Sequence, residues 1–169
     1  MIKSDLMSYH LKIDGLVKGL FTGHAFYAVL LYRIGNWMAR HHIKFFPDVI
    51  KFYLLRKYAC EISPYATIGA PFKLHHTPGI VIGHEVIMGD RCEVFQNVTI
   101  GSNRKERGGR FMPIIGDDCS IGAGAVVVGA ISIGNNVKIG ANSYVSCDVP
   151  DDAVVAGNPA RIVRRTDAK

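Results

Sequence analysis

The most regular feature of the sequence is a six-residue repeat that runs from Ile115 to Pro150. An aliphatic residue opens each hexad, and a small or aliphatic residue follows four positions later. The opening residues are Ile115, Ile121, Val127, Ile133, Ile139 and Val145. A period of six matches neither the 3.6-residue period of a helix nor the two-residue period of a strand. It predicts short strands joined by tight corners, in a parallel β-helix whose neighbouring coils share one core.

The repeat also covers earlier parts of the chain, with two interruptions. It begins at Ile62 and slips by two residues across Ile80-Val81. Residues 102–113 break it completely, and their cations and glycines predict an exposed excursion loop that leaves the coil at a corner. Because three hexads make one triangular coil, residues three hexads apart, such as Ile115 and Ile133, should stack on each other.

The first part of the chain lacks the repeat and is expected to be helical. Apolar residues recur there at spacings of three and four, and a second helical run follows Pro47. The residues expected on one face of the first helix are Phe26, Leu30, Arg33, Ile34, Trp37 and Met38. One interpretation is a cap over the open end of the β-helix, which would otherwise expose unpaired strand edges. A second interpretation is that its basic and aromatic residues hold the protein against the inner face of an anionic membrane.

These patterns predict a mainly β protein with a short α-helical N-terminal region. We divide the chain into a helical N-terminal cap at 1–58, a β-helix at 59–152 with its excursion loop at 102–113, and a C-terminal tail at 153–169.

Composition narrows the classes of partner. The net charge of +6 suits an anionic partner, but no aromatic-basic platform or helix-turn-helix pattern supports nucleic acid. The four cysteines show no CxxC spacing, and Cys92 and Cys119 fall on inward positions of the repeat. We therefore expect no disulfide and no metal site, and a cytoplasmic location. No signal peptide is apparent, and the longest apolar run is too short to cross a bilayer.

Several features of the sequence carry a family resemblance. The hexads, the excursion loop and the closing AGNPARIV resemble the hexapeptide-repeat acyltransferases. The segment EISP…LHHTPGIVIG is similar to the serine acetyltransferase branch, and especially to its relatives in exopolysaccharide biosynthesis of the colanic-acid type. The resemblance covers roughly residues 60–165. It implies a left-handed β-helix, a homotrimer with active sites between subunits, and acetyl-CoA as the acyl donor.

The resemblance also implies a catalytic base. Acetyl transfer to a hydroxyl needs a group that accepts the hydroxyl proton, and histidine suits this role near neutral pH. Strand alternation points His75 and His76 to opposite faces, so they should not share one role. The family pattern places the base at His76, and His75 stands where the serine enzymes carry an aspartate. Glu61 occupies the position of the carboxylate that orients the base. Solvated surface histidines and a solvated carboxylate are the alternatives.

Coenzyme A would bind along the coils. The family lays the pantetheine arm near the positions of Gly101, Ala123 and Ala141, where small side chains let a ligand approach the backbone. Arg161 and Arg164 are candidate partners of the phosphates. The alternatives are ordinary corner residues and a solvated basic tail.

The excursion loop departs from the serine enzymes. They carry Arg-His-Pro where this chain has Phe111-Met112-Pro113, so two apolar side chains replace groups that could meet a carboxylate. We expect Arg110 and Met112, together with His75, to contact the acceptor.

This departure favours a sugar hydroxyl as the acceptor. The sequence therefore predicts an acetyl-CoA-dependent O-acetyltransferase of polysaccharide biosynthesis, with direct attack of the hydroxyl on the thioester. A serine O-acetyltransferase of cysteine biosynthesis and a catalytically inactive β-helix binding module are the alternatives.

Overall fold

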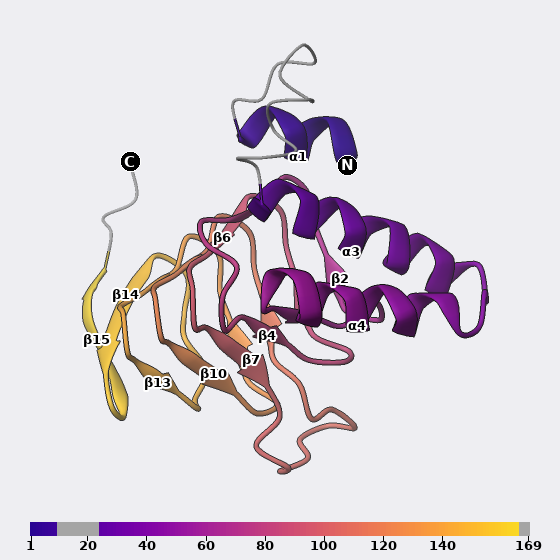
Figure 1. Ribbon diagram of the computed structural model, residues 1–169. Helices are drawn as coiled ribbons and strands as arrows, with labels where there is room; N and C mark the ends of the chain where they lie inside the picture. Colours follow the sequence, from indigo (N-terminus) through magenta and orange to yellow (C-terminus); the bar gives the residue numbers. More distant parts are fainter. Residues whose placement is uncertain (10–23, 166–169) are drawn as a thin grey trace.

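The structure is a computed structural model that describes residues 1–9 and 24–165 (Figure 1). Helices α1 (Ile2–Ser8), α3 (His24–Arg40) and α4 (Phe46–Tyr58) precede the strands. The strands are β1 (Glu61–Ile62), β2 (Thr67–Ile68), β3 (Phe72–Leu74), β4 (Val81–Ile82), β5 (Ile87–Met88), β6 (Cys92–Val94), β7 (Thr99–Gly101), β8 (Ile114–Ile115), β9 (Ser120–Ile121), β10 (Val126–Val128), β11 (Ser132–Ile133), β12 (Lys138–Ile139), β13 (Tyr144–Val145), β14 (Ala153–Gly157) and β15 (Ala160–Arg165).

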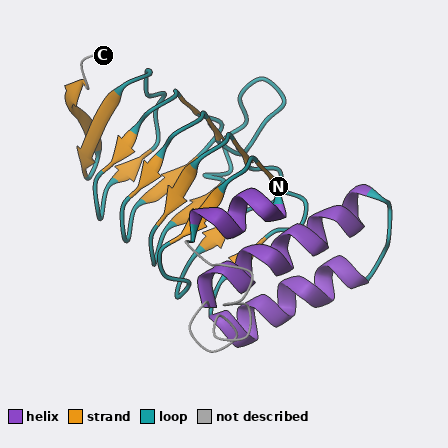
Figure 2. Ribbon diagram, turned by 90° about the horizontal axis from the view of Figure 1, so that it is seen from above, coloured by secondary structure: helices purple, strands orange, loops and turns teal. Residues whose placement is uncertain are grey.

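Strands three apart in the chain pair in parallel. Sheet A has the order β1-β4-β7-β10-β13, sheet B the order β11-β8-β5-β2, and sheet C the order β15-β14-β12-β9-β6-β3. The chain therefore winds through sheets A, B and C in turn, and Figure 2 shows the resulting stack of strands. Only β15 runs antiparallel to its neighbour, β14. The predicted left-handed parallel β-helix is confirmed.

The strand registers show where the period holds and where it fails. Ile133 pairs with Ile115, so the predicted stacking of residues three hexads apart is confirmed. Ile82 pairs with Ile62, two residues more than one regular coil. The two extra residues lie in the corner between β3 and β4, because Leu74 pairs in the same shifted register with Val94. The slip thus inserts residues at one corner and leaves the strands intact.

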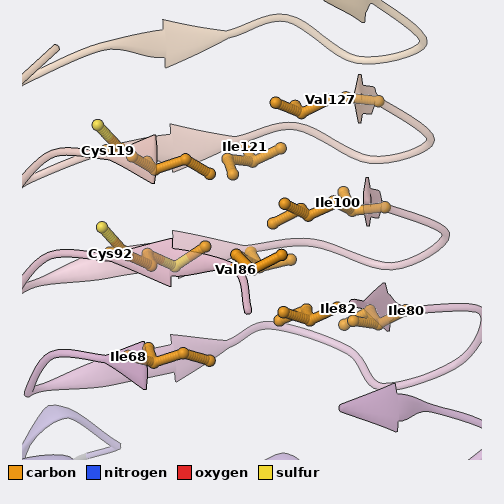
Figure 3. Close-up of a cluster of buried hydrophobic side chains, with 14 of the residues drawn as sticks. Ile68, Ile80, Ile82, Val86, Cys92, Ile100, Cys119, Ile121 and Val127 are labelled. Carbon is orange, nitrogen blue, oxygen red and sulfur yellow. The ribbon is translucent and has the colours of Figure 1, made fainter. Parts of the chain in front are cut away.

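Inward side chains of successive coils form continuous columns. Ile82, Ile100 and Val127 are buried on sheet A, and Figure 3 shows such side chains lying in layers, coil upon coil. Cys92 and Cys119 share one column and are buried, as the repeat predicted. The β-helix therefore has one core along its whole length.

The corner between sheets B and C carries a ladder of polar side chains. Asp117 Oδ1 accepts from the backbone N–H of Asp90 at 2.9 Å, and Asn135 Oδ1 accepts from that of Asp117 at 2.8 Å. Asp151 Oδ1 continues the ladder with the N–H of Asn135 at 2.6 Å. Asp90, Asp117 and Asn135 each follow a glycine because there is no room for more: a Cβ on Gly116 would lie 2.5 Å from Asn135 Oδ1. This close approach explains the Gly-Asp and Gly-Asn pairs of the repeat.

The helices lie against the open edge of the first coil. Arg33 and Asp5 form a buried ion pair at 2.9 Å. The same guanidinium donates to the carbonyls of Ile68 and Gly69, and Asp5 Oδ1 accepts from the N–H of Phe72 at 2.7 Å. The edge carbonyls and N–H groups that no coil can pair are therefore bonded by helix side chains.

Two further side chains of α3 bond the same edge. Tyr32 Oη donates to the carbonyl of Ala66 at 2.9 Å, and Asn36 Nδ2 donates to the carbonyl of Pro64 at 2.8 Å. These contacts correct the predicted helix face. Ile34 and Trp37 are exposed, and the buried face combines apolar residues such as Ala28 and Val29 with polar groups, because it covers backbone carbonyls as well as the end of the apolar core.

Candidate functional site

The corner that contains the two extra residues carries the adjacent histidines. It follows β3 and leads into β4, and its backbone joins the next coil where the N–H of Asn97 donates to the carbonyl of Pro78 at 2.9 Å. Thr77 in this corner is buried, whereas the side chain of His76 is exposed. The insertion therefore presents His76 outside the regular surface of the coils.

His76 lines a cavity between this corner and the helices. The cavity has a volume of about 560 Å³ and is bounded by the beginning of α3, the end of α4 and the histidine corner. Its lining includes His24, Lys57, Tyr58, His75, His76 and Thr77. Within the described residues, His76 has no side-chain hydrogen bond, so both ring nitrogens are available to a ligand.

His75 has different partners from His76. Its Nε2 lies 2.8 Å from Glu93 Oε2, and its ring stacks on that of Phe95 with centroids 4.0 Å apart. A histidine held by a carboxylate and an aromatic ring is fixed in orientation. The two histidines line the same cavity but differ in their side-chain contacts.

The structure does not bring Glu61 to His76. The Glu61 carboxylate instead forms an ion pair with Lys51 of α4 at 2.9 Å, and both side chains are partly exposed. No hydrogen bond joins Glu61 to His76 in the described part of the chain. The carboxylate that does hold a histidine here is Glu93, which the sequence analysis missed. Regular stacking does not signal this pair, since β3 and β6 pair residues 20 apart, such as Lys73 and Glu93, whereas His75 and Glu93 are 18 apart.

Small residues continue along the corner below His76. The N–H of Gly124 donates to the carbonyl of Gln96 at 2.9 Å, and the N–H of Asn142 donates to that of Ala123 at 2.8 Å. Ala141 adjoins the same corner, since a Cβ on Gly122 would lie 2.8 Å from its backbone nitrogen. Ala123 and Ala141 therefore lie along one corner that runs from the histidines toward the end of the β-helix.

The arginines of the tail lie at the far end of this corner. Arg161 pairs with Ala156 across the β14–β15 hairpin, and Arg164 pairs with Val154. Both arginine side chains are exposed. Ala156 in turn adjoins the coil that carries Ala141, because a Cβ on Gly140 would lie 3.0 Å from the Ala156 Cβ.

Gly101 is the last residue of β7, at the end of the sheet A strands that lies away from the histidine corner, where the excursion loop begins. It pairs with Val128, and a Cβ placed on it would meet no atom within 4 Å. The space beside this glycine is therefore open.

The excursion loop is bonded to the β-helix on the side where Gly101 lies. Arg107 Nη1 donates to Asp148 Oδ2 at 2.6 Å. The backbone N–H of Ser132 and the Arg107 guanidinium together lower the pKa of Asp148. Met112 packs near Gly83, and Nη1 of Arg110 is buried with no hydrogen-bond partner in the described chain. None of these loop residues lines the cavity that holds His76.

The side chains that line the His76 cavity are either positively charged or neutral. Lys57 is exposed and forms no ion pair with a described residue, and the other titratable lining groups are His24, His75, His76 and Tyr58. Burial raises the pKa of Tyr58 above its usual value. Among the described residues no cluster of three or more metal-ligating side chains is present.

The comparisons with known proteins agree on one family. The model "Bacterial transferase hexapeptide (six repeats)" matches residues 112–147. A serine acetyltransferase of Bacillus pumilus (strain SAFR-032) is 38% identical over 153 residues, which cover 90% of this chain and 70% of the relative. The chain belongs to the serine acetyltransferase family.

Solved structures of this family extend the likeness to the fold. The serine acetyltransferase of Neisseria gonorrhoeae aligns with a TM-score of 0.88 at 32% identity, over 99% of this chain and 67% of that one. A serine acetyltransferase from Brucella abortus strain S19 in complex with coenzyme A aligns with a TM-score of 0.81 at 32% identity, over 86% and 58% of the two chains. The chain spans between 50% and 70% of the length of the curated relatives it matches.

These relatives overturn the predicted acceptor. The expectation of a sugar hydroxyl and of a colanic-acid-type relative is wrong, because the matched proteins are named serine acetyltransferases. The prediction depended on Phe111 and Met112. Within one chain, those residues lie in a loop that is separate from the His76 cavity.

Proposed function

We propose that this protein transfers the acetyl group of acetyl-CoA to the side-chain hydroxyl of serine. The observation that carries the proposal is His76, an unpaired histidine in an open cavity, within a chain of the serine acetyltransferase family. A histidine whose ring nitrogens are free can accept the proton of a hydroxyl at neutral pH.

In the proposed reaction His76 is the general base. It takes the hydroxyl proton of serine while the oxygen attacks the carbonyl carbon of the thioester. The tetrahedral intermediate then collapses, the carbon–sulfur bond breaks, and the thiolate of coenzyme A receives the proton from the imidazolium. No acyl-enzyme is required, and the buried Cys60, Cys92 and Cys119 are poorly placed to form one.

Glu61 is proposed as the positioning residue of the base only in the loaded enzyme. In the free chain its carboxylate engages Lys51, so it must exchange this partner for the imidazole of His76. The pair with Lys51 is partly exposed, and such pairs are weak enough to exchange.

The corner below His76 is proposed as the path of coenzyme A. The small side chains of Ala123 and Ala141 would let the pantetheine arm form hydrogen bonds with the backbone. Gly101, at the other end of the sheet A strands, would also leave room for the ligand. Arg161 and Arg164, exposed at the end of the corner, would contact the phosphates through charge-assisted hydrogen bonds. The Brucella abortus relative with bound coenzyme A supports this ligand class.

The acceptor contacts are proposed to form between subunits of a homotrimer. Within one chain the loop residues Arg110 and Met112 line no part of the His76 cavity. A neighbouring chain would bring its loop to this cavity, and the buried, unpartnered Nη1 of Arg110 would then meet the serine carboxylate. Exposed Val81 and Ile87 on the coil faces suit such an assembly. His75, held by Glu93, would border the acceptor.

The proposal is tested by an acceptor screen with labelled acetyl-CoA. Serine, nucleotide sugars, oligosaccharides and other small hydroxyl compounds are offered separately to the purified protein. We expect O-acetylserine at an efficiency typical of enzymes, with a kcat/KM of about 10⁴ M⁻¹s⁻¹ or more. Absence of acetylserine would refute the proposal. Thermal stabilisation by coenzyme A without consumption of the thioester would identify an inactive binding module instead.

A further inference from the structure

The outer face of α4 is apolar although it faces solvent. Its buried residues, Pro47 and Leu54, contact the rest of the protein. On the opposite side of the helix, Val49 and Phe52 are 43% and 64% exposed, and Phe45, which caps the helix, is 73% exposed. Residues 45, 49 and 52 follow each other at spacings of four and three, so they form one apolar stripe along the helix. We call this stripe, with Tyr53 beside it, the α4 outer face.

The surroundings of the α4 outer face are strongly basic. Residues 37–57 contain five basic residues and one acidic residue, Asp48, which gives a net charge of +4 out of +6 for the whole chain. The basic residues are Arg40, Lys44, Lys51, Arg56 and Lys57. Of these, only Lys51 has an ion pair within the described residues, with Glu61. The positive charge of the protein is therefore concentrated beside its exposed aromatic residues.

The hairpin of α3 and α4 also projects from the body of the protein. Figures 1 and 2 show the connection between the two helices lying beyond the edge of the coils, at the end of the β-helix opposite to β15. A flat surface could therefore reach Phe45 and Phe46 without meeting the β-helix. No helix in the described chain is long and apolar enough to cross a bilayer. An apolar stripe of this kind can enter only the interfacial layer of a membrane.

We propose that the α4 outer face docks on an anionic lipid bilayer. Phe45, Val49 and Phe52 enter the interface between headgroups and acyl chains, and the surrounding lysines and arginines attract the anionic headgroups. Charge favours this occupant over a second copy of the chain. A symmetric contact through the same face would bring two copies of this positively charged surface together, whereas a bilayer rich in anionic lipid supplies the opposite charge.

The first test measures co-sedimentation of the full chain with vesicles. Vesicles of phosphatidylcholine alone are compared with vesicles of phosphatidylcholine and phosphatidylglycerol. We expect binding to the anionic vesicles that falls as salt is raised, because screening weakens contacts between exposed charges. Failure to bind anionic vesicles, or equal binding to both compositions, would overturn the proposal.

The second test separates the aromatic and the basic contributions. Phe45→Ser/Phe52→Ser should lower partitioning to anionic vesicles by about tenfold or more, because it removes the inserted side chains. Phe111→Ser, which changes an exposed phenylalanine in the excursion loop, should not. Lys44→Gln/Arg56→Gln should weaken binding more than Arg104→Gln/Lys138→Gln, an equal loss of charge elsewhere.

The serine acetyltransferase activity of Phe45→Ser/Phe52→Ser without vesicles should equal that of the unmodified chain. Equal activity would show that the variant is folded.

A third measurement decides whether the α4 outer face binds a membrane or a second copy of the chain. If this double substitution lowers the oligomeric state in analytical ultracentrifugation, the face joins copies of the chain and the membrane proposal is wrong. An unchanged oligomeric state together with lost vesicle binding supports the bilayer.

Discussion

The first coil and the last coils are built from the same kind of hexad, but different bonds hold them. Within the coils of residues 115–150, strands β9, β10 and β12 have a paired strand on both sides, and rungs such as Asp117 and Asn135 bond one corner to the next. The first coil has a coil neighbour on one side only. Its free edge is bonded by Asp5, Tyr32 and Arg33 of the helices.

This difference shows what regularity achieves in the fold. Where the period holds, equivalent positions in successive coils make the same contacts. We therefore expect each residue there to make a small contribution to the free energy of unfolding, which its equivalents repeat. Where the period ends or slips, individual residues make contacts that are not repeated in other coils. Arg33 bonds the edge of the first coil, and the extra residues between β3 and β4 present His76 to the cavity.

The largest effect on stability is expected at the helix–coil contact. Arg33→Met leaves the Asp5 carboxylate buried without its cation, and loss of one partner of a buried pair costs about 3–5 kcal/mol. Urea unfolding followed by circular dichroism measures the loss. The matched control is Arg91→Met in the regular coils, where Arg91 binds Asp118 at 2.7 Å on the exposed surface. Similar losses for the two variants would contradict the contrast between the regions.

A smaller effect is expected at a rung of the polar ladder. Asp117→Ala leaves the N–H of Asp90 without its acceptor, which costs about 1 kcal/mol for a partly exposed group. The same unfolding experiment measures it, and acetyl transfer should be unchanged because the rung lies outside the His76 cavity. A loss as large as that of Arg33→Met would show that the rungs are not interchangeable.

Alkaline pH should lower the stability of the protein, in part through buried groups at the helix–coil contact. Burial raises the pKa of Tyr32 and of Cys60 to about 12, from usual values of 10.0 and 9.0. Both groups stay neutral to a higher pH in the folded protein than in the unfolded chain. Their contribution to stability is complete below pH 9, falls as the unfolded groups ionise, and is lost by about pH 12.

Tyr32→Phe tests this prediction. It removes a hydrogen bond and so should lower stability near pH 7, but its unfolding free energy should fall less between pH 9 and pH 12 than that of the unmodified chain. Parallel pH profiles for the two proteins would exclude Tyr32 as a source of the alkaline loss.

The smallest effect is expected at the second histidine. Glu93→Gln weakens the pair with His75, which is partly exposed, so the unfolding free energy should change by less than about 1 kcal/mol. Its kcat for acetyl transfer should stay close to that of the unmodified chain, because the proposed base is His76. A kcat that fell by orders of magnitude would instead make His75 and Glu93 the catalytic pair.

The sequence predicted the β-helix well because hexad periodicity is a local signal that repeats. The stacking of Ile115 and Ile133, the slip before Ile82 and the inward cysteines all follow from counting. The helix face was predicted only in part, because apolar spacing cannot show that the surface beneath α3 includes backbone carbonyls, which Arg33 and Asn36 bond.

Contacts between distant segments were predicted less well. Glu61 was assigned to His76 by its place in a motif, but Lys51, on a helix whose packing the motif does not encode, lies closer to its carboxylate. Glu93 was missed because it pairs with Lys73 on the neighbouring strand and reaches His75 only diagonally. The acceptor was wrong because two loop side chains were given more weight than the similarity of the whole chain.

The central claim is tested most directly by the rate of O-acetylserine formation in His76→Ala. His76 is exposed, so the variant should fold like the unmodified chain and unfold at the same urea concentration. We predict that kcat falls by about 10²–10⁴-fold, the usual contribution of a general base, while His75→Ala retains a much larger share of activity. A folded His76→Ala protein that acetylates serine at the unmodified rate would contradict the account.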